Sequence, residues 1–401
     1  MQELKSKFMK SSVRGPRRTK DNPFTKDSSH EQPTKSGHTW TCPSSGEYGL
    51  IGYTIQQWIQ THAESTLKIQ ENHWAEITVA PGHCENYLRD GLITFVYQGV
   101  LYAYFANWSE DFHRVFSDNS DAPAIDAIKH SIRWENPYRQ QHLQIMACNQ
   151  RSGLEMEPRK APDTAFESVI IDDGIRQELR DNTVFHLQEI PGDNGIILHG
   201  PPGTGKSLSC QAIIKETIEA GYSTCYVVGR IDFDFLDRML ERYLAPCLVI
   251  LEDIDTYAQD RQSNPHAYFS DFLQFMSGLS EREEKIVVIA TTNHIDYLDD
   301  AIARRPVRFN RRFHIDLPDE IQLQALLQHY FGANSILPDD AVRLCRKAKF
   351  TGSHIAEIRR TSEIFAIKQK QTPIQCFQQA FDIVSAQFAN ASEAHCVGFA
   401  S

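Results

Sequence analysis

The segment Gly200–Ser207 constrains the fold of this chain more than any other stretch. It reads Gly-Pro-Pro-Gly-Thr-Gly-Lys-Ser and fits the pattern G-x-x-x-x-G-K-[ST]. Asn194–His199 before it is a short apolar run of strand length, and Leu208–Ala220 after it has a helical pattern. A strand, a glycine-rich loop and a helix in this order predict a loop that wraps phosphate groups. The alternative is an ordinary Gly/Pro turn before a helix.

The residue types in this loop suit a triphosphate with Mg²⁺. Glycines let backbone N–H groups turn inward, and side chains there would block the phosphates. Lys206 is expected to reach the β- and γ-phosphates, and the Ser207 hydroxyl is expected to ligate Mg²⁺. The residues predicted here to hold the nucleotide are Gly200, Pro201, Pro202, Gly203, Thr204, Gly205, Lys206, Ser207 and Leu208.

Length and composition set the outer limits. With 401 residues, 41% of them hydrophobic and 23% charged, the chain is expected to fold into two globular domains. Its formal net charge of -11 argues against a general nucleic-acid binder. Nine cysteines without a Cys-x-x-Cys pair favour buried free thiols in a reducing compartment over a disulfide framework or a zinc site. We therefore expect a cytoplasmic protein.

No transmembrane segment is expected. The most membrane-like stretch, Gly91–Trp108, is interrupted by Gln98-Gly99 and is rich in Thr and Tyr. It predicts two strands, Leu92–Tyr97 and Val100–Asn107, joined by a tight turn, with a membrane-spanning helix as the weaker alternative. The N-terminus has no apolar core region, so no secretory signal is expected.

The first part of the chain divides into a tail and a separate unit. Residues 1–39 are polar and basic and are expected to be a disordered tail, either solvated or acting as an arm for nucleic acid or an acidic partner. Residues 40–158 are expected to form a small, aromatic-rich α+β domain with a helix at Tyr53–Glu64 and further strands at His73–Val79 and Gln141–Cys148. This unit contains no catalytic pattern, and we expect it to bind a protein substrate or adaptor.

Beyond a Pro-containing linker, strands and helices alternate over residues 159–318 and give way to helices alone over 319–390, before a short tail at 391–401. The alternation predicts an α/β fold, in which a parallel sheet is covered by helices on both faces and binds ligands at the carboxyl ends of its strands. The expected strands are Tyr222–Val228, Cys247–Leu251, Lys285–Thr291 and Arg312–Ile315. The expected C-terminal helices are Glu320–Tyr330, Asp339–Lys347, Ser353–Lys368 and Pro373–Phe388.

Polar residues follow two of these strands. The apolar run at 248–251 ends in Glu252-Asp253-Ile254-Asp255, and we expect its strand to lie beside the strand that precedes the glycine-rich loop. One carboxylate would then hold Mg²⁺ and another would polarise the attacking water, whereas the alternative is a solvated acidic turn. Asn293 follows the next apolar strand, where its amide could hydrogen-bond the γ-phosphate or the lytic water.

The segment Leu298–Arg311 carries many arginines with no acidic stretch beside them. Guanidinium groups suit phosphates, so an anion from outside the subunit would relieve their mutual repulsion. A basic surface loop is the alternative interpretation.

With these motifs in place, residues 166–388 resemble an AAA-family ATPase module. Gly200–Ser207 is similar to the family's G-P-P-G-T-G-K-[ST], and Ala290–Asn293 resembles its sensor-1 strand. Leu298–Arg311 matches its L-D-x-A-[IL]-x-x-R-P-x-R-F-[DN]-R segment without a gap. The resemblance implies a P-loop NTPase sheet with a C-terminal helical lid, ATP and Mg²⁺ as cofactors, and a homo-oligomeric ring of six subunits, with seven as the alternative.

The resemblance also assigns roles by position. Asn293 would be sensor 1, and Arg308 and Arg311 would be arginine fingers that reach the nucleotide of a neighbouring subunit. Gly352 and Ser353 resemble the sensor-2 turn, where the backbone meets adenosine, and Ile170 lies in a segment similar to the adenine-contacting entry segment.

Two departures from the family pattern stand out. In the family, the apolar strand that corresponds to residues 248–251 ends in Asp-Glu and is called Walker B, whereas this chain has Glu252-Asp253 there. By position Glu252 takes the metal role and Asp253 activates water, with Asp255 as a residue that could share either role. The same order occurs in the Bcs-type mitochondrial AAA chaperones. The chain also lacks the aromatic-apolar-Gly pore loop of threading family members. In the corresponding segment, Phe233 and Phe235 would either line a pore or serve as a helix start and core contacts. The short connection in which they lie again resembles the Bcs-type group.

These features predict an ATP-hydrolysing ring that remodels or translocates a protein partner, in the manner of a chaperone. Two alternatives remain. The inverted carboxylates and missing pore loop fit a nucleotide-gated assembly scaffold with little hydrolysis. The basic tail fits a DNA-associated AAA+ loader, which the acidic net charge weakens.

Overall fold

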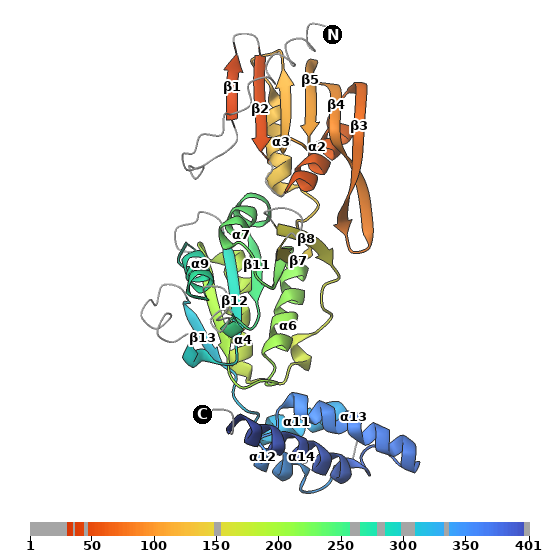
Figure 1. The fold of residues 1–401 in the computed structure, drawn as a ribbon, viewed down its shortest axis with the longest axis vertical. Coiled ribbons are helices and arrows are strands. Elements are labelled where there is room, and N and C mark those ends of the chain that lie inside the picture. The colour runs from red at the N-terminus through yellow and green to blue at the C-terminus, as the bar shows by residue number, and fades with distance from the viewer. Residues whose placement is uncertain are drawn as a thin grey trace.

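The computed structural model describes residues 30–34, 37–43, 47–147, 154–256, 265–278, 285–297, 309–332 and 337–396. Three units follow one another along the molecule, an N-terminal sheet, a central α/β core and a C-terminal group of helices (Figure 1). Residues 1–29 of the expected basic tail, residues 397–401 and Arg308 lie outside the described residues.

The N-terminal unit is a six-stranded antiparallel sheet with two helices. The strand order is β1-β2-β6-β5-β4-β3. The strands are β1 (His30–Thr34), β2 (Gly37–Pro43), β3 (Ser65–Ala80), β4 (His83–Tyr97), β5 (Val100–Asn107) and β6 (Phe112–Ser117), and the helices are α2 (Tyr48–His62) and α3 (Pro123–Trp134). Residues 30–34 and 37–39 pair as strands in this sheet, although the sequence analysis assigned them to a disordered tail.

The prediction of two strands between residues 91 and 108 is confirmed. β4 and β5 pair antiparallel, and the connecting Gln98 and Gly99 both have positive φ, 49° and 69°. Two consecutive positive φ angles are typical of a tight hairpin turn whose twist matches the strands. Within the ranges that the structure describes, none of the helices combines the length and the apolar character needed to cross a membrane.

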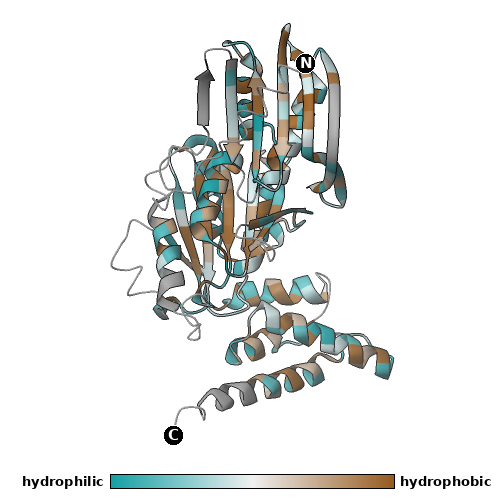
Figure 2. Ribbon diagram, turned by 45° about the horizontal axis from the view of Figure 1, so that its top comes forward, coloured by the Kyte–Doolittle hydropathy of each residue, from teal (hydrophilic) through white to brown (hydrophobic). Residues whose placement is uncertain are grey.

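The central core is built on a seven-stranded sheet in the order β13-β9-β12-β11-β10-β7-β8. All neighbours pair parallel except β7 and β8. The strands are β7 (His142–Ala147), β8 (Leu154–Arg159), β9 (Asn194–His199), β10 (Ser223–Val228), β11 (Cys247–Leu251), β12 (Ile286–Thr292) and β13 (Arg311–His314). All residues of β11 and β12 are buried, as expected for parallel strands covered on both faces, and Figure 2 shows apolar residues along the central strands.

Helices cover both faces of this sheet. Leu179, Leu187 and Ile213 pack with Leu248 and Ile250 on one face, whereas aromatic residues of α7 and α9 pack with alternate residues of β11 on the other. The helical segments are η1 (Phe166–Ser168), α4 (Asp173–Asn182), α5 (Val184–Glu189), α6 (Lys206–Glu219), α7 (Phe233–Met239), η2 (Leu240–Leu244), α9 (Pro265–Gly278) and η4 (Ile295–Tyr297). The core thus has the α/β fold of P-loop NTPases.

Two expectations about this sheet need correction. The strand expected at Gln141–Cys148 was assigned to the N-terminal unit, but as β7 it pairs parallel with β10 in the core sheet, and β8 extends the same edge. The acidic strand β11 does not lie beside the loop strand β9, because β12 lies between them. The carboxyl ends of β9, β12 and β11 still meet at one edge, so the polar residues after them converge.

The N-terminal unit and the core share one continuous group of buried apolar residues. The junction is also hydrogen-bonded: buried Asn136 donates to the carbonyl oxygen of Tyr243 at 2.9 Å, and Arg139 donates to that of Leu244 at 3.3 Å. Both acceptors lie in η2, directly after α7. The N-terminal unit is therefore attached to the segment that follows β10.

The C-terminal unit is helical, as predicted. It consists of α11 (Glu320–Phe331), α12 (Ala341–Lys347), α13 (Gly352–Gln369) and α14 (Phe377–Cys396), packed around a core of its own. Asp319 and Gln322 form a reciprocal capping box that fixes the start of α11 directly after the core.

Candidate functional site

The loop between β9 and α6 adopts a backbone that its glycines make possible. Gly200, Gly203 and Gly205 have φ angles of 143°, 75° and 109°. A Cβ atom on Gly200 would lie 2.1 Å from the carbonyl oxygen of Ile315, and one on Gly203 would lie 2.5 Å from Ser353 Oγ. The loop is thus wedged between the core and the first turn of α13.

A cavity of about 720 Å³ opens beside this loop, between the core and the C-terminal helices. It is lined by the entry segment 168–172, the loop, the ends of β11 and β12, and the helices α11 and α13. Of the residues predicted for the site, those lining the cavity are Ile170, Pro202, Gly203, Thr204, Gly205, Lys206, Ser207, Leu208, Asp253, Asn293, Gly352 and Ser353. The other predicted residues that the structure describes, Gly200, Pro201, Glu252 and Arg311, are not part of its lining.

Lys206 is a buried cation at the base of the loop, 6% exposed. Its Nζ donates to the carbonyl oxygens of Gly200 and Pro201 at 2.7 and 2.8 Å. Burial lowers the pKa of Lys206, against the opposing effect of Asp253 and Asp255. An anion in the cavity would favour the charged lysine, because opposite charges stabilise each other most where water is excluded.

Asp253 lies at the centre of the polar cluster. Its backbone is left-handed, with φ of 51°, and its N–H donates to Thr291 Oγ1 at 3.1 Å. Asn293 Nδ2 donates to Asp253 Oδ1 at 3.3 Å, which brings the predicted base and the predicted sensor together. Partial burial, followed by the charges of Asp255 and Glu252, raises the pKa of Asp253.

The two other carboxylates have different partners. Asp255 is buried and accepts hydrogen bonds from Thr292 Oγ1 at 2.8 Å and from the Asn293 N–H at 3.3 Å, so it ties the acidic turn to β12. Glu252 accepts a hydrogen bond from the phenol of Tyr226 on β10. Asp255 is therefore occupied as a structural acceptor and Glu252 is bonded to Tyr226, whereas Asp253 is the carboxylate of the three that lines the cavity.

The donor set fits Mg²⁺ bound together with a triphosphate. Mg²⁺ prefers oxygen ligands and is usually held by one or two carboxylates and substrate phosphates rather than by an all-protein cage. Ser207 and Asp253 line the cavity, and Glu252 directly precedes Asp253 at the end of β11. Among the described residues, no three His, Cys, Asp or Glu side chains gather in an arrangement able to hold a metal by themselves.

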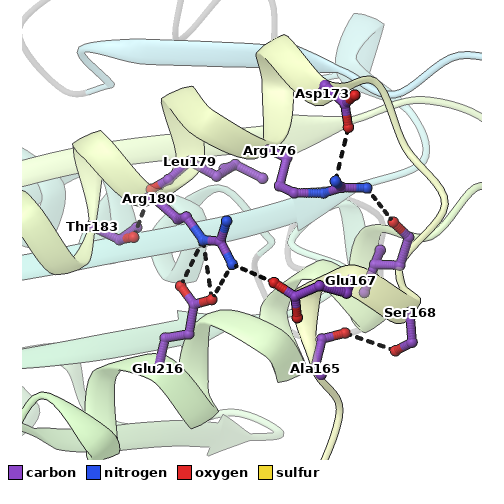
Figure 3. Close-up of polar contacts among 10 residues, drawn as sticks. Ala165, Glu167, Ser168, Asp173, Arg176, Leu179, Arg180, Thr183 and Glu216 are labelled. Carbon is purple, nitrogen blue, oxygen red and sulfur yellow. Dashed lines mark hydrogen bonds and ion pairs between the residues drawn. The ribbon is translucent and has the colours of Figure 1, made fainter.

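The entry segment is fixed by arginines of α4 (Figure 3). Arg176 Nη2 donates to the carbonyl oxygen of Val169 at 3.1 Å. Arg180 binds both carboxylate oxygens of Glu216 on α6 through Nε, each at 3.0 Å, and reaches Glu167 at 3.1 Å. The segment that contains Ile170 is thereby attached to α6, the helix that follows the glycine-rich loop.

Several residues of the cavity were not predicted. Glu357 and Arg360 of α13 lie on the same helix face as Ser353, four and seven residues further on, a spacing that could have revealed them. The Tyr226 contact depends on the pairing of β10 with β11, which the sequence alone does not give.

Two further expectations are decided by side-chain placement. Phe233 and Phe235 are buried in the core, and Asp232 caps their helix by accepting from the Phe235 N–H at 2.9 Å. The helix-start interpretation is therefore confirmed, and the pore-lining one is wrong. Arg311 is exposed at the start of β13, where its Nε donates to Asn182 Oδ1 at 3.2 Å, outside the cavity of its own subunit.

The fold defines the class, an α/β core of the P-loop type with a helical lid beside the cavity. In agreement, residues 196–317 match the family "ATPase family associated with various cellular activities (AAA)". Lys206, Glu252, Asp253, Asn293 and Arg311 all fall within this match.

Curated proteins similar to this chain include an ATP-dependent zinc metalloprotease FtsH and a spastin. The FtsH of Mycoplasmoides gallisepticum is 30% identical over 199 residues, covering 45% of this chain and 25% of that protein. The spastin of Drosophila mojavensis is 31% identical over 224 residues, covering 51% and 28%. The matched part thus spans about a quarter of the length of these relatives. A solved structure described as the FIGL-1 AAA domain aligns with a TM-score of 0.45 and 18% identity, over 55% of this chain and 83% of that one.

Proposed function

We propose that this protein is an ATP-binding and ATP-hydrolysing AAA-type ATPase that works as an oligomeric ring, of six or seven subunits, and remodels a protein partner. One observation carries the proposal: a glycine-dependent loop, a buried lysine, a carboxylate and an amide from three different strand ends all line one cavity between core and lid. The AAA match over residues 196–317 supports it.

In this proposal the triphosphate lies along the loop. The N–H groups of residues 203–207 and the ammonium of Lys206 bind the β- and γ-phosphates, and the lysine exchanges its bonds to the loop carbonyls for phosphate oxygens. Gly352, Ser353 and the entry segment around Ile170, all of which line the cavity, enclose the nucleoside. Ser207 and Glu252 would hold Mg²⁺, which when bound would neutralise charge on the phosphates.

Hydrolysis requires a water to attack the γ-phosphorus as the bond to the ADP oxygen breaks. Asp253 orients this water and accepts its proton, and Asn293 holds the Asp253 carboxylate or the water in position. Arg308 and Arg311 of a neighbouring subunit stabilise charge in the transition state, an effect on the order of 10³-fold or more.

The N-terminal unit, which lacks the loop and its acids, would bind the protein partner. Its hydrogen bonds to η2 attach it to the segment that follows β10, which supports a coupling between partner binding and the core. The order Glu252-Asp253 is also found in the Bcs-type chaperones, and we therefore include a chaperone of this type in the proposal.

The test is ATP hydrolysis by the purified full chain and by Lys206→Ala. The wild type is expected to release phosphate steadily, and the variant is expected to lose turnover because its phosphate-binding cation is gone. An unchanged rate in Lys206→Ala would contradict the proposal.

A nucleotide-gated scaffold is the second candidate, because Asn293 already occupies one oxygen of Asp253. Steady phosphate release that falls in Arg308→Ala would exclude the scaffold. Nucleotide-dependent assembly without phosphate release would favour it.

A further inference from the structure

The phenol of Tyr226 makes a contact that the family motifs do not account for. Tyr226 lies near the end of β10, and Glu252 follows the last residue of β11. In the parallel register Tyr226 pairs with Ile250, so Glu252 is its diagonal neighbour, two residues further along the adjacent strand. The phenolic O–H donates to Glu252 Oε2.

This contact addresses the departure at the end of β11. A glutamate is one methylene longer than the aspartate that stands at this position in the family pattern, and the additional rotatable bond lets its carboxylate adopt more orientations. A hydrogen bond to one carboxylate oxygen removes much of that freedom, and bonds to charged acceptors are among the stronger ones in proteins.

The surroundings place this pair beside the loop helix. Cys210 lies one turn after Ser207 on α6 and is completely buried, and its electrostatic neighbours include Glu252 and Lys206. The Glu252 carboxylate, bonded to Tyr226 on β10, therefore also lies within electrostatic range of the helix that carries Ser207.

We infer that Tyr226 is a positioning residue of the Mg²⁺ site: its hydroxyl orients the Glu252 carboxylate toward the metal that Ser207 and the triphosphate share. The inference rests on the proposed function. Partners that orient a metal-binding carboxylate or histidine typically contribute about 10- to 100-fold in metal affinity.

The first experiment uses Tyr226→Phe in the full chain, a change that removes one oxygen atom. Mn²⁺ serves as the probe, and its binding is measured by electron paramagnetic resonance with a non-hydrolysable ATP analogue. We expect Mn²⁺ affinity to fall roughly 10- to 100-fold. The affinity for the same analogue in excess EDTA should stay within about threefold, because the phenol does not touch the nucleotide. Tyr222→Phe, at the residue directly before the same strand, is the matched control and should change neither value.

Two results would overturn the inference. One is an unchanged Mn²⁺ affinity in Tyr226→Phe. The other is an equal loss of analogue binding with and without metal, which would show that the residue only supports the fold. A wild type that binds neither analogue nor Mn²⁺ would overturn the proposed function itself, and the inference with it.

A second measurement does not depend on how the variant folds. 3-Fluorotyrosine at position 226 of the otherwise unchanged chain reports on a paramagnetic metal nearby. With Mn²⁺ and the analogue its ¹⁹F resonance should broaden, whereas the same label at position 222 should broaden much less. Equal broadening at both positions would contradict the placement of Tyr226 at the metal site.

Discussion

The two sheets of this protein have similar strand numbers but distribute their polar chemistry differently. In the core, parallel strands end at one edge, and the loop and polar residues after β9, β11 and β12 meet there. In the N-terminal sheet, neighbouring antiparallel strands end at opposite edges, and its buried polar groups satisfy one another inside the fold. His113, for example, lies between the Tyr104 hydroxyl and the carbonyl oxygen of Tyr48, each 3.0 Å away. Changes in the core sheet should therefore alter nucleotide chemistry, and changes in the N-terminal sheet should alter stability.

The largest effect on ATP binding is expected from Gly200→Ala. Its Cβ would meet a backbone oxygen at 2.1 Å, and neither partner is a flexible side-chain end. The displaced loop should weaken ATP binding by at least about tenfold, because each lost N–H bond to a charged phosphate costs about 1.5–3 kcal/mol. Fluorescent ATP-analogue titration measures this. Gly229→Ala is the control, since it has a positive φ of 72° with nothing within 4 Å of its added Cβ, and it should bind normally. Equal binding by both variants would contradict the role of the loop.

Asp253→Asn should separate catalysis from binding. The amide cannot accept the proton of water, so turnover should fall roughly 10²- to 10⁴-fold. ATP affinity should change only a few-fold, because the lysine and the loop remain. Phosphate-release assays and analogue titrations give the two numbers, with Asp296→Asn on the exposed η4 as the control. If instead Asp253→Asn hydrolyses ATP at the wild-type rate, the water-activating role passes to another residue.

The N-terminal sheet should respond to pH rather than to nucleotide. Burial lowers the pKa of His113 to about 3, well below the ordinary 6.5. Between these two pKa values the unfolded chain binds a proton at His113 and the folded chain does not. The contribution of His113 to the free energy of unfolding is therefore fully present above pH 6.5 and is lost as pH falls toward 3. The free energy of unfolding, measured with urea, should fall by up to about 1.4 kcal/mol per pH unit from this group alone.

The quantity to compare between wild type and the His113 variant is the slope of the free energy of unfolding against pH, not the free energy itself. His113→Gln should flatten the dependence on pH below 6.5 and leave analogue affinity at pH 7.5 unchanged. His130→Gln on the exposed side of α3 should leave the slope as it is. A slope in His113→Gln equal to that of the wild type would show that the buried imidazole is not its source.

The smallest effect is expected from Arg180→Met. Its ion pairs with Glu167 and Glu216 are partly exposed, with 31% of the arginine side chain accessible, so water screens them. The free energy of unfolding should fall by no more than about 1 kcal/mol. Analogue affinity should fall a few-fold, because the entry segment is held less firmly. Arg343→Met in α12, whose exposed pair is similar but distant from the cavity, separates the two effects. A larger loss of affinity in Arg343→Met would refute this role of Arg180.

The sequence predicted the core better than it predicted its edges. β9, β11 and β12 are buried on both faces and stand out as continuous apolar runs between turn residues. β7 alternates buried and partly exposed residues, a pattern that fits either sheet, and its pairing with β10 joins residues about eighty positions apart. No local signal distinguishes these two possibilities.

The site shows the same division. Loop residues such as Lys206 were predicted because they are consecutive in the chain, so the motif alone fixes their positions relative to one another. The contacts of Tyr226 with Glu252 and of Arg180 with Glu216 depend on strand register and helix packing, which a single sequence does not specify. The buried acceptor role of Asp255 likewise follows from β12 lying next to β11 rather than from the acidic motif.

The central claim is that the cavity beside residues 200–207 binds ATP with Mg²⁺. Isothermal titration of the intact chain with ATP and Mg²⁺ tests it most directly. The account predicts saturable binding that disappears in Lys206→Ala and in Gly200→Ala but persists in Gly229→Ala. An intact chain that shows no heat of binding at millimolar ATP, or equal binding in all three variants, would contradict it.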